Sequence, residues 1–169
     1  CTPNKQRASE LAQKINEVNA LRQKTLTDSV LSARKKVDKK SLIFIWGDYH
    51  EGIVGLVASR LVEEFWRPAI VVSRGDEFSK ASARSIPGFN ILENIRELRE
   101  LLVEGGGHPM AAGFTIRTEN LEIFSQKLQG LERKTLTKEM LSPKLKIDCK
   151  LDMSLINKEL AEKLQEFEP

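Results

Sequence analysis

Cysteines, long apolar runs and a leader-like N-terminus are scarce or missing in this sequence of 169 residues. No run of about 18 or more apolar residues occurs, which excludes a membrane-spanning helix. The first residues have no apolar core behind a basic patch and no initiator Met, so we expect no signal peptide and infer a fragment of a longer protein. The two cysteines, Cys1 and Cys149, form neither a disulfide framework nor a metal-ligand spacing, which favours a reducing, cytoplasmic location.

The motifs of several enzyme classes are also absent. No GxSxG, Walker A or GxGxxG run occurs, which excludes the serine-hydrolase elbow, the P-loop and the dinucleotide-binding fingerprint. The six aspartates form no D-x-D pair, and the two histidines, His50 and His108, lie far apart. His50-Glu51 does not begin a zinc-protease motif, because Val54 stands where the second histidine is required. The sequence therefore predicts no metal site in this chain.

The composition itself is that of a folded protein. It has 40% hydrophobic residues, 30% charged residues and a net charge of +3, which fits one domain with appendages. Residues 1–40 hold ten Lys and Arg against four Asp and Glu, whereas the rest of the chain is slightly acidic. A basic leading segment is compatible with nucleic acid nearby, and a solvated helix face explains it as well.

The first 40 residues predict a long helix. Residues 5–38 contain no Gly or Pro, and apolar residues recur at steps of three and four. This periodicity is typical of one amphipathic helix, roughly 50 Å long if unbroken. A helix of that length before a compact domain favours a connector.

The middle of the chain predicts an α/β fold with a mixed β-sheet flanked by helices. We expect strands at 41–46, 69–73, 78–86 and 112–117, helices at 53–66, 90–103 and 118–140, and loops at 47–52 and 105–109. The first two strands and the helix between them form a βαβ unit, which favours a parallel pair. Asn90 is expected to cap the second of these helices.

The last segment predicts one strand and one helix. Residues 144–151 alternate apolar and charged side chains, as in a half-exposed strand. Ser154 is expected to cap a final helix that runs to about Phe167.

Two polar motifs in the middle of the chain suit an anion. Gly105-Gly106-Gly107-His108-Pro109 lets backbone N–H groups approach a ligand, and His108 can donate to a phosphate. Ser82 and Arg84 point to the same face of one strand, where a hydroxyl and a guanidinium suit a phosphate. The alternatives are an ordinary glycine turn for the first motif and an edge strand with outward polar residues for the second.

Taken in order, these motifs resemble a known family. The runs YHEGIVGLVASRL at 49–61, RPAIV at 67–71, SARS at 82–85 and GGHPMAAG at 106–113 resemble the DHH-associated C-terminal domain of RecJ-type single-strand-specific exonucleases. The resemblance covers nearly the whole chain. Two positions depart from the family pattern. Tyr49 stands at an aromatic position where the family commonly has Trp, and Gly105 or Gly106 stands where the family often has Phe.

The resemblance implies a division of labour. In the family, two divalent ions, usually Mn²⁺ or Mg²⁺, are held by Asp and His residues of a preceding DHH domain and activate water. This fragment, inactive alone, would then hold single-stranded DNA as part of a 5′-to-3′ exonuclease and pair with the missing DHH domain. The residues that carry over as phosphate-binding are Ser82, Arg84, Gly106, Gly107 and His108, with His50 and Arg60 as secondary candidates. Arg60 can instead pair with Glu63 or Glu64 on its own helix.

The resemblance also implies three parts: a connector helix at 1–40, a substrate-binding domain at 41–141, and the start of an oligonucleotide-binding domain at 142–169. Two other functions remain open. One is a related phosphodiesterase that acts on short oligonucleotides or cyclic dinucleotides, and the other is a non-catalytic replication scaffold. The related domain of an editing tRNA synthetase fits less well, because the connector and the trailing strand differ.

Overall fold

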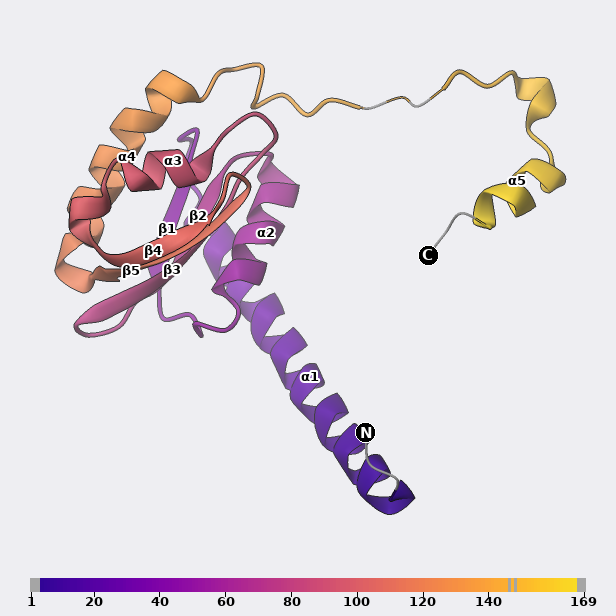
Figure 1. Ribbon diagram of the computed structural model, residues 1–169, viewed down its shortest axis with the longest axis horizontal. Coiled ribbons are helices and arrows are strands. Elements are labelled where there is room, and N and C mark those ends of the chain that lie inside the picture. The colour runs from indigo at the N-terminus through magenta and orange to yellow at the C-terminus, as the bar shows by residue number, and fades with distance from the viewer. Residues whose placement is uncertain (1–3, 146, 148, 167–169) are drawn as a thin grey trace.

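The structure is a computed structural model that describes residues 4–145, 147 and 149–166. Within these residues, five strands form one mixed sheet in the order β1-β2-β3-β5-β4 (Figure 1). The strands are β1 (Ile43–Gly47), β2 (Ala69–Ser73), β3 (Phe78–Arg84), β4 (Leu102–His108) and β5 (Ala111–Arg117). β1 and β2 pair directly and in parallel, and the helix α2 (Val54–Phe65) connects them in sequence. The other neighbouring strands are antiparallel. The predicted fold class and parallel pair are confirmed.

Helices lie on both faces of the sheet. α1 (Lys5–Arg34) and α2 lie on one side, and α3 (Ile91–Arg96) and α4 (Leu121–Thr135) lie on the other (Figure 1). Alternate side chains of β2 point to opposite faces of the sheet, so this strand contributes to two hydrophobic clusters. Ala69 and Val71 pack in the cluster with α1 and α2, whereas Ile70 and Val72 pack in the cluster with α3 and α4. The apolar run of β2 is thus buried on both faces, as predicted.

The helices cover the two faces unequally. α2 packs against β2 and β3, whereas the helices that contact β4 and β5 lie on the opposite face: α3 contacts both strands, and Phe124 of α4 packs on Phe114 of β5. β4 is one of the two edge strands of the sheet, and it is exposed along nearly its whole length. The face of β5 and β4 on the α2 side is therefore open to solvent.

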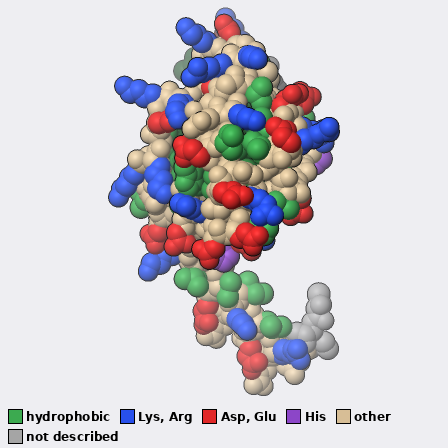
Figure 2. All heavy atoms as spheres, turned by 90° about the vertical axis from the view of Figure 1, so that its left-hand side faces the viewer, with side chains coloured by type: hydrophobic (Ala, Val, Ile, Leu, Met, Phe, Trp, Pro, Cys, Tyr) green, Lys and Arg blue, Asp and Glu red, His purple; other side chains and the backbone are tan. Residues whose placement is uncertain are grey.

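α1 is only partly attached to the body of the protein. Asn4 caps its start by accepting a hydrogen bond from Arg7 N, and Val30 and Ala33 near its end are buried. The rest projects away from the sheet, with hydrophobic side chains exposed on it (Figures 1 and 2). These exposed residues are Leu11, Ile15, Val18 and Leu21. The predicted long helix is confirmed, although it ends at Arg34 rather than at residue 38.

Three expectations for the middle of the chain are wrong. The predicted loop at 105–109 is largely strand, because β4 continues through His108 and pairs with β5 as far as Ala111. The helix capped by Asn90 ends at Arg96 instead of Val103, since a short 3₁₀ turn and then β4 follow it. The next helix, α4, ends at Thr135 rather than at 140. The capping role of Asn90 is confirmed, because its side chain accepts from Glu93 N at 3.3 Å.

The last segment also differs from expectation. The described residues among 144–151 lie in no strand, because an alternating pattern forms a strand only when a neighbour supplies hydrogen bonds. The final helix is α5 (Lys158–Gln165), capped by Asn157, whose side chain accepts from Leu160 N at 2.9 Å. Ser154 instead lies in a 3₁₀ turn that Asp152 caps. The predicted helix end, Phe167, lies outside the described residues.

None of the helices that the structure describes is long and apolar enough to cross a membrane.

Candidate functional site

The uncovered part of the sheet carries its side chains in rows across β3, β5 and β4. Residues paired directly across antiparallel strands point to the same face, so the strand register defines each row. We call the surface made by these three rows the open face. The rows are Arg84, Ala111 and His108; then Ser82, Gly113 and Gly106; then Lys80, Thr115 and Glu104.

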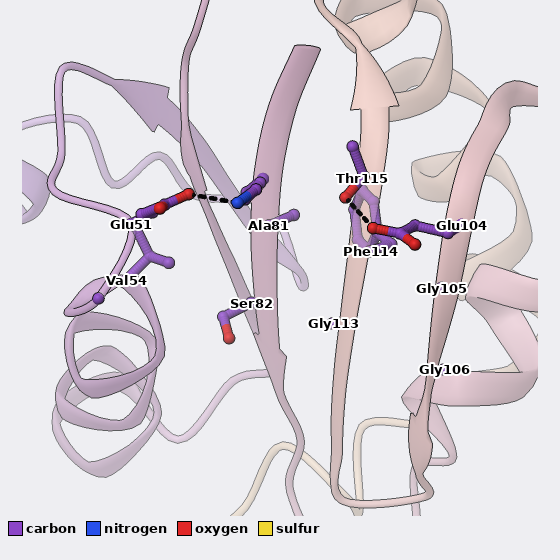
Figure 3. A pocket seen from close by; sticks show the side chains of 12 residues that line it. Glu51, Val54, Ala81, Ser82, Glu104, Gly105, Gly106, Gly113, Phe114 and Thr115 are labelled. Atoms are coloured by element: carbon purple, nitrogen blue, oxygen red, sulfur yellow. Dashed lines mark hydrogen bonds and ion pairs between the residues drawn. The ribbon is translucent and has the colours of Figure 1, made fainter.

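A groove of about 720 Å³ runs over the second and third rows. Its floor is the open face, and one wall is the segment that leads into α2, at Glu51, Gly52 and Val54 (Figure 3). The groove thus lies between the first turn of a helix and an exposed sheet surface. The helix start was expected from sequence, whereas part of the sheet surface was not, because residues 105–108 of β4 were expected to form a loop.

The groove floor is flat because two glycines form its middle row. A Cβ at Gly106 would meet nothing within 4 Å, and one at Gly113 would approach only Ala81 O, at 3.6 Å. Glycine inside a strand lowers stability relative to a residue with a side chain. Since the fold does not require either glycine, their presence favours close approach of a ligand to the sheet.

Ser82 and Arg84 lie against the first turn of α2. A Cβ at Gly55 would be 3.1 Å from Ser82 Oγ and 3.0 Å from Arg84 Nη2, so both side chains reach the space that Gly55 leaves free. The start of α2 carries no side-chain cap from the described residues, and exposed N–H groups at a helix start attract anions. Hydroxyl, guanidinium and helix start thus converge on one point.

The strand that carries Ser82 and Arg84 is interior. β3 lies between β2 and β5, so the alternative of an edge strand with outward polar residues is wrong. The expectation that the two side chains share a face is confirmed by their common approach to Gly55. Arg84 also donates from Nη1 to Ala83 O at 2.9 Å, which orients the guanidinium.

His108 and Gly107 are neighbours with different placements. His108 is exposed in the same row as Arg84, two strand spacings away, or about 10 Å. Gly107 has φ +148°, and a Cβ there would lie 2.6 Å from Ala112 Cα on the opposite face. The backbone of the hairpin therefore requires Gly107, whereas His108 belongs to the open face.

The third row supplies charged side chains that were not predicted as site residues from the sequence. Lys80 Nζ lies 2.7 Å from Glu51 Oε2, and Thr115 Oγ1 donates to Glu104 Oε1 at 3.0 Å (Figure 3). The hydrogen bond and charge of Lys80 lower the pKa of Glu51, and Glu51 in turn raises the pKa of Lys80. The pair is therefore ionised at neutral pH. Lys80 could have been found from the sequence, because its two-residue spacing from Ser82 and Arg84 places it on the same face of the strand.

His50 and Arg60 lie outside the groove. His50 Nδ1 accepts from Gly52 N at 3.1 Å, and the side chain lines a separate cavity of about 330 Å³ beside α1. Arg60 pairs with Glu63 at 2.8 Å and lines a cleft of about 530 Å³ between α1 and α2. The structure therefore brings four predicted residues together on the open face, and these two are not among them.

The described residues also differ from the ligand sets that bind divalent metal ions. Across residues 4–145, 147 and 149–166, no group of three or more His, Cys, Asp or Glu could hold a metal ion. The residues that the structure describes therefore do not fit a divalent-metal site.

Comparisons with known proteins agree on one family. A family model for the DHHA1 domain matches residues 38–134. The single-stranded-DNA-specific exonuclease RecJ of Bacillus subtilis (strain 168) is 38% identical over 148 residues, which are 83% of this chain and 19% of that protein. Its namesake from Haemophilus influenzae is 30% identical over 170 residues, which are 92% of this chain and 30% of that protein.

Solved structures give the same result. The crystal structure of RecJ from Thermus thermophilus in complex with Mg²⁺ matches with a TM-score of 0.74 at 27% identity, over 79% of this chain and 21% of that one. The Mn²⁺ complex matches with a TM-score of 0.73. This chain thus spans less than a third of the length of each of these relatives.

Proposed function

Because this chain belongs to the DHHA1 domain family, we propose that it is the DNA-holding part of a 5′-to-3′ exonuclease specific for single-stranded DNA. Relatives named as single-stranded-DNA-specific exonucleases align over most of the chain. In this proposal the open face holds the sugar–phosphate backbone near the 5′ end. The catalytic DHH domain is a partner that this chain does not contain.

The phosphate grip follows from the groups at the start of α2. Arg84 donates to the non-bridging oxygens of a phosphate, Ser82 adds a hydroxyl donor, and the helix start adds backbone N–H groups. His108 on β4, at the other end of the row that begins with Arg84, contacts the same strand of DNA. The flat row at Gly113 and Gly106 lets the backbone lie against the sheet.

The chemical step belongs elsewhere in this proposal. The Thermus thermophilus relative was solved with Mn²⁺ and with Mg²⁺, and such ions activate water and stabilise negative charge. Since no suitable ligand cluster occurs in the described part of this chain, the ions would be held by the DHH domain. The grip contributes by positioning, because it fixes where the phosphodiester lies relative to the ions.

The observation that carries the proposal is the pairing of two dispensable glycines with two phosphate-binding side chains. Two glycines that the fold does not need share the row of Ser82, and Arg84 lies in the next row. A purely structural sheet would gain stability from side chains at these positions. A surface that accepts a polyanion explains both features together.

The division of the chain follows from the same proposal. Residues 1–40 would connect to the DHH domain, 41–141 would hold the substrate in the cytoplasm, and 142–169 would begin an oligonucleotide-binding domain. The detached course of α1 away from the sheet is compatible with a connector (Figure 1).

Binding of a 5′-phosphorylated single-stranded oligonucleotide tests the grip. We expect Arg84→Ala to weaken binding roughly tenfold and to reduce the slope of affinity against salt by about one, because one phosphate contact is lost. Fluorescence anisotropy across a salt titration measures both quantities. Arg133→Ala, on the exposed surface of α4, makes the same charge change away from the groove and should leave binding unchanged. Equal affinities for all three proteins would remove Arg84 from the site.

A further inference from the structure

An exposed aromatic side chain lies at one end of the open face. Phe78 is the first residue of β3, and its side chain is 42% exposed. The two-residue alternation of a strand places it on the same face as Lys80 and Ser82. It continues the line of those residues beyond the groove.

The position of Phe78 is fixed by its neighbours. The next residue, Ser79, is fully buried and lies 2.8 Å from Thr118 through their hydroxyl groups, so this end of β3 is anchored to the opposite face. Phe78 itself belongs to neither hydrophobic core cluster of the described residues. The ring is therefore held outward by a rigid strand without contributing to the core.

A cation accompanies the ring. Arg117 is the residue paired with Phe78 across β5, and its Cζ lies 5.3 Å from the ring centroid. Glu77 lies 3.5 Å from the same guanidinium and offsets its charge. An aromatic ring and a guanidinium on an uncovered sheet face form a surface on which a flat heteroaromatic ring can stack.

The distance to the phosphate grip suits a single strand of DNA. Phe78 is four residues from Ser82 along β3, which is roughly 13 Å. That length corresponds to no more than about four stacked nucleotides at about 3.4 Å each, and to fewer when the strand is extended. Lys80 lies between the two positions and can follow the backbone.

We propose that Phe78 and Arg117 form a stacking platform for a nucleobase of the DNA whose 5′ phosphate Ser82 and Arg84 hold. This inference rests on the proposed function. Every base has a π-face, so the platform contributes affinity without selecting a sequence. It also sets a minimum length for tight binding, because a nucleotide must reach Phe78 from the grip.

Two probes separate the platform from the grip: thymidine 5′-monophosphate, which is too short to reach Phe78 from the grip, and a 5′-phosphorylated thymidine dodecanucleotide. Phe78→Ala should weaken binding of the dodecanucleotide about tenfold, since stacking on an aromatic residue contributes about 1–3 kcal/mol per base. It should leave binding of thymidine 5′-monophosphate unaffected, whereas Arg84→Ala should weaken binding of both probes. Phe78→Trp should retain the affinity, and its fluorescence should be quenched by the longer probe.

The controls address folding and apolar exposure. Ile123→Ala removes another exposed apolar side chain, 44% exposed on α4, and should bind both probes as the unchanged protein does. Thermal melting by circular dichroism verifies that each variant is folded. The loss caused by Phe78→Ala should persist at high salt, because stacking is not screened.

The outcomes distinguish the two proposals. If Phe78→Ala lowers the melting temperature but binds the dodecanucleotide normally, the Phe78–Arg117 pair is only a cross-strand packing contact and the platform is refuted. If Arg84→Ala still weakens binding in that case, the proposed function stands. If the unchanged protein binds neither probe, both proposals are refuted.

Discussion

Adjacent glycines of β4 differ in what the fold requires of them. Gly106 faces open space, so Gly106→Ala should leave stability unchanged or raise it by up to about 1 kcal/mol. Gly107 has φ +148° and no room for a side chain, so Gly107→Ala should lower stability by about 1–3 kcal/mol. Urea unfolding followed by circular dichroism measures both changes.

Gly106 also tests the groove floor. Gly106→Ala should reduce affinity for single-stranded DNA despite its normal stability, because the new methyl group occupies the groove floor. Gly130→Ala is the matched control, since a Cβ there also meets nothing within 4 Å but lies on α4. Its stability should rise by about 1 kcal/mol with unchanged binding. Normal DNA binding by Gly106→Ala would contradict the role assigned to the floor.

Glu132 on α4 is a buried carboxyl whose effect depends on pH. It is 4% exposed, and burial raises its pKa. The folded state therefore holds the proton more tightly than the unfolded chain does, and stability falls as pH rises from the usual glutamate pKa, about 4.3, through the raised value. Nearby Arg133 opposes this shift only in part.

Removing the charge of Glu132 should therefore stabilise the protein at neutral pH. We expect Glu132→Gln to raise the free energy of unfolding by about 1 kcal/mol there, because a neutral amide is less costly to bury. The difference should shrink as pH falls toward about 4.3, where the carboxyl of the unchanged protein is also protonated. Thermal melts across this pH range measure it, and a gain that does not vary with pH would contradict the explanation.

At the scale of elements, local patterns predicted some boundaries well and others poorly. The βαβ unit and the cap at Asn90 were predictable, because apolar periodicity and capping depend on nearby residues. β4 was mistaken for a loop, because three consecutive glycines resemble a turn. β4 is a strand because Ala111–Arg117 supplies a partner along its length.

The candidate site shows the same division. Ser82 and Arg84 were predicted to share a face, since the alternation of a strand is a local property. That Gly55 of α2 leaves room for both side chains could not be read from the sequence, because it depends on how α2 packs on β3. Gly113, Lys80 and Glu104 were missed for a related reason: the register of β3, β5 and β4 defines their rows.

At the scale of the whole molecule, the proposal separates holding DNA from cleaving it. We expect this chain alone to show no hydrolysis of single-stranded DNA, with or without Mn²⁺, because its described residues contain no cluster of metal ligands. Release of nucleotides from a labelled oligonucleotide measures activity. Metal-dependent turnover by a pure preparation, abolished by a chelator, would contradict the division of labour.

By itself, the sequence determined the α/β class, the long first helix and the shared face of the proposed phosphate-binding pair. These follow from periodicity and motif spacing, which depend on residues close together in the chain. Only the tertiary structure decided that β4 is a strand, that Gly106 and Gly113 form one floor, and that His50 and Arg60 lie apart from it. The physical reason is that strand partners and the seating of a helix on a sheet are set by contacts between residues distant in sequence.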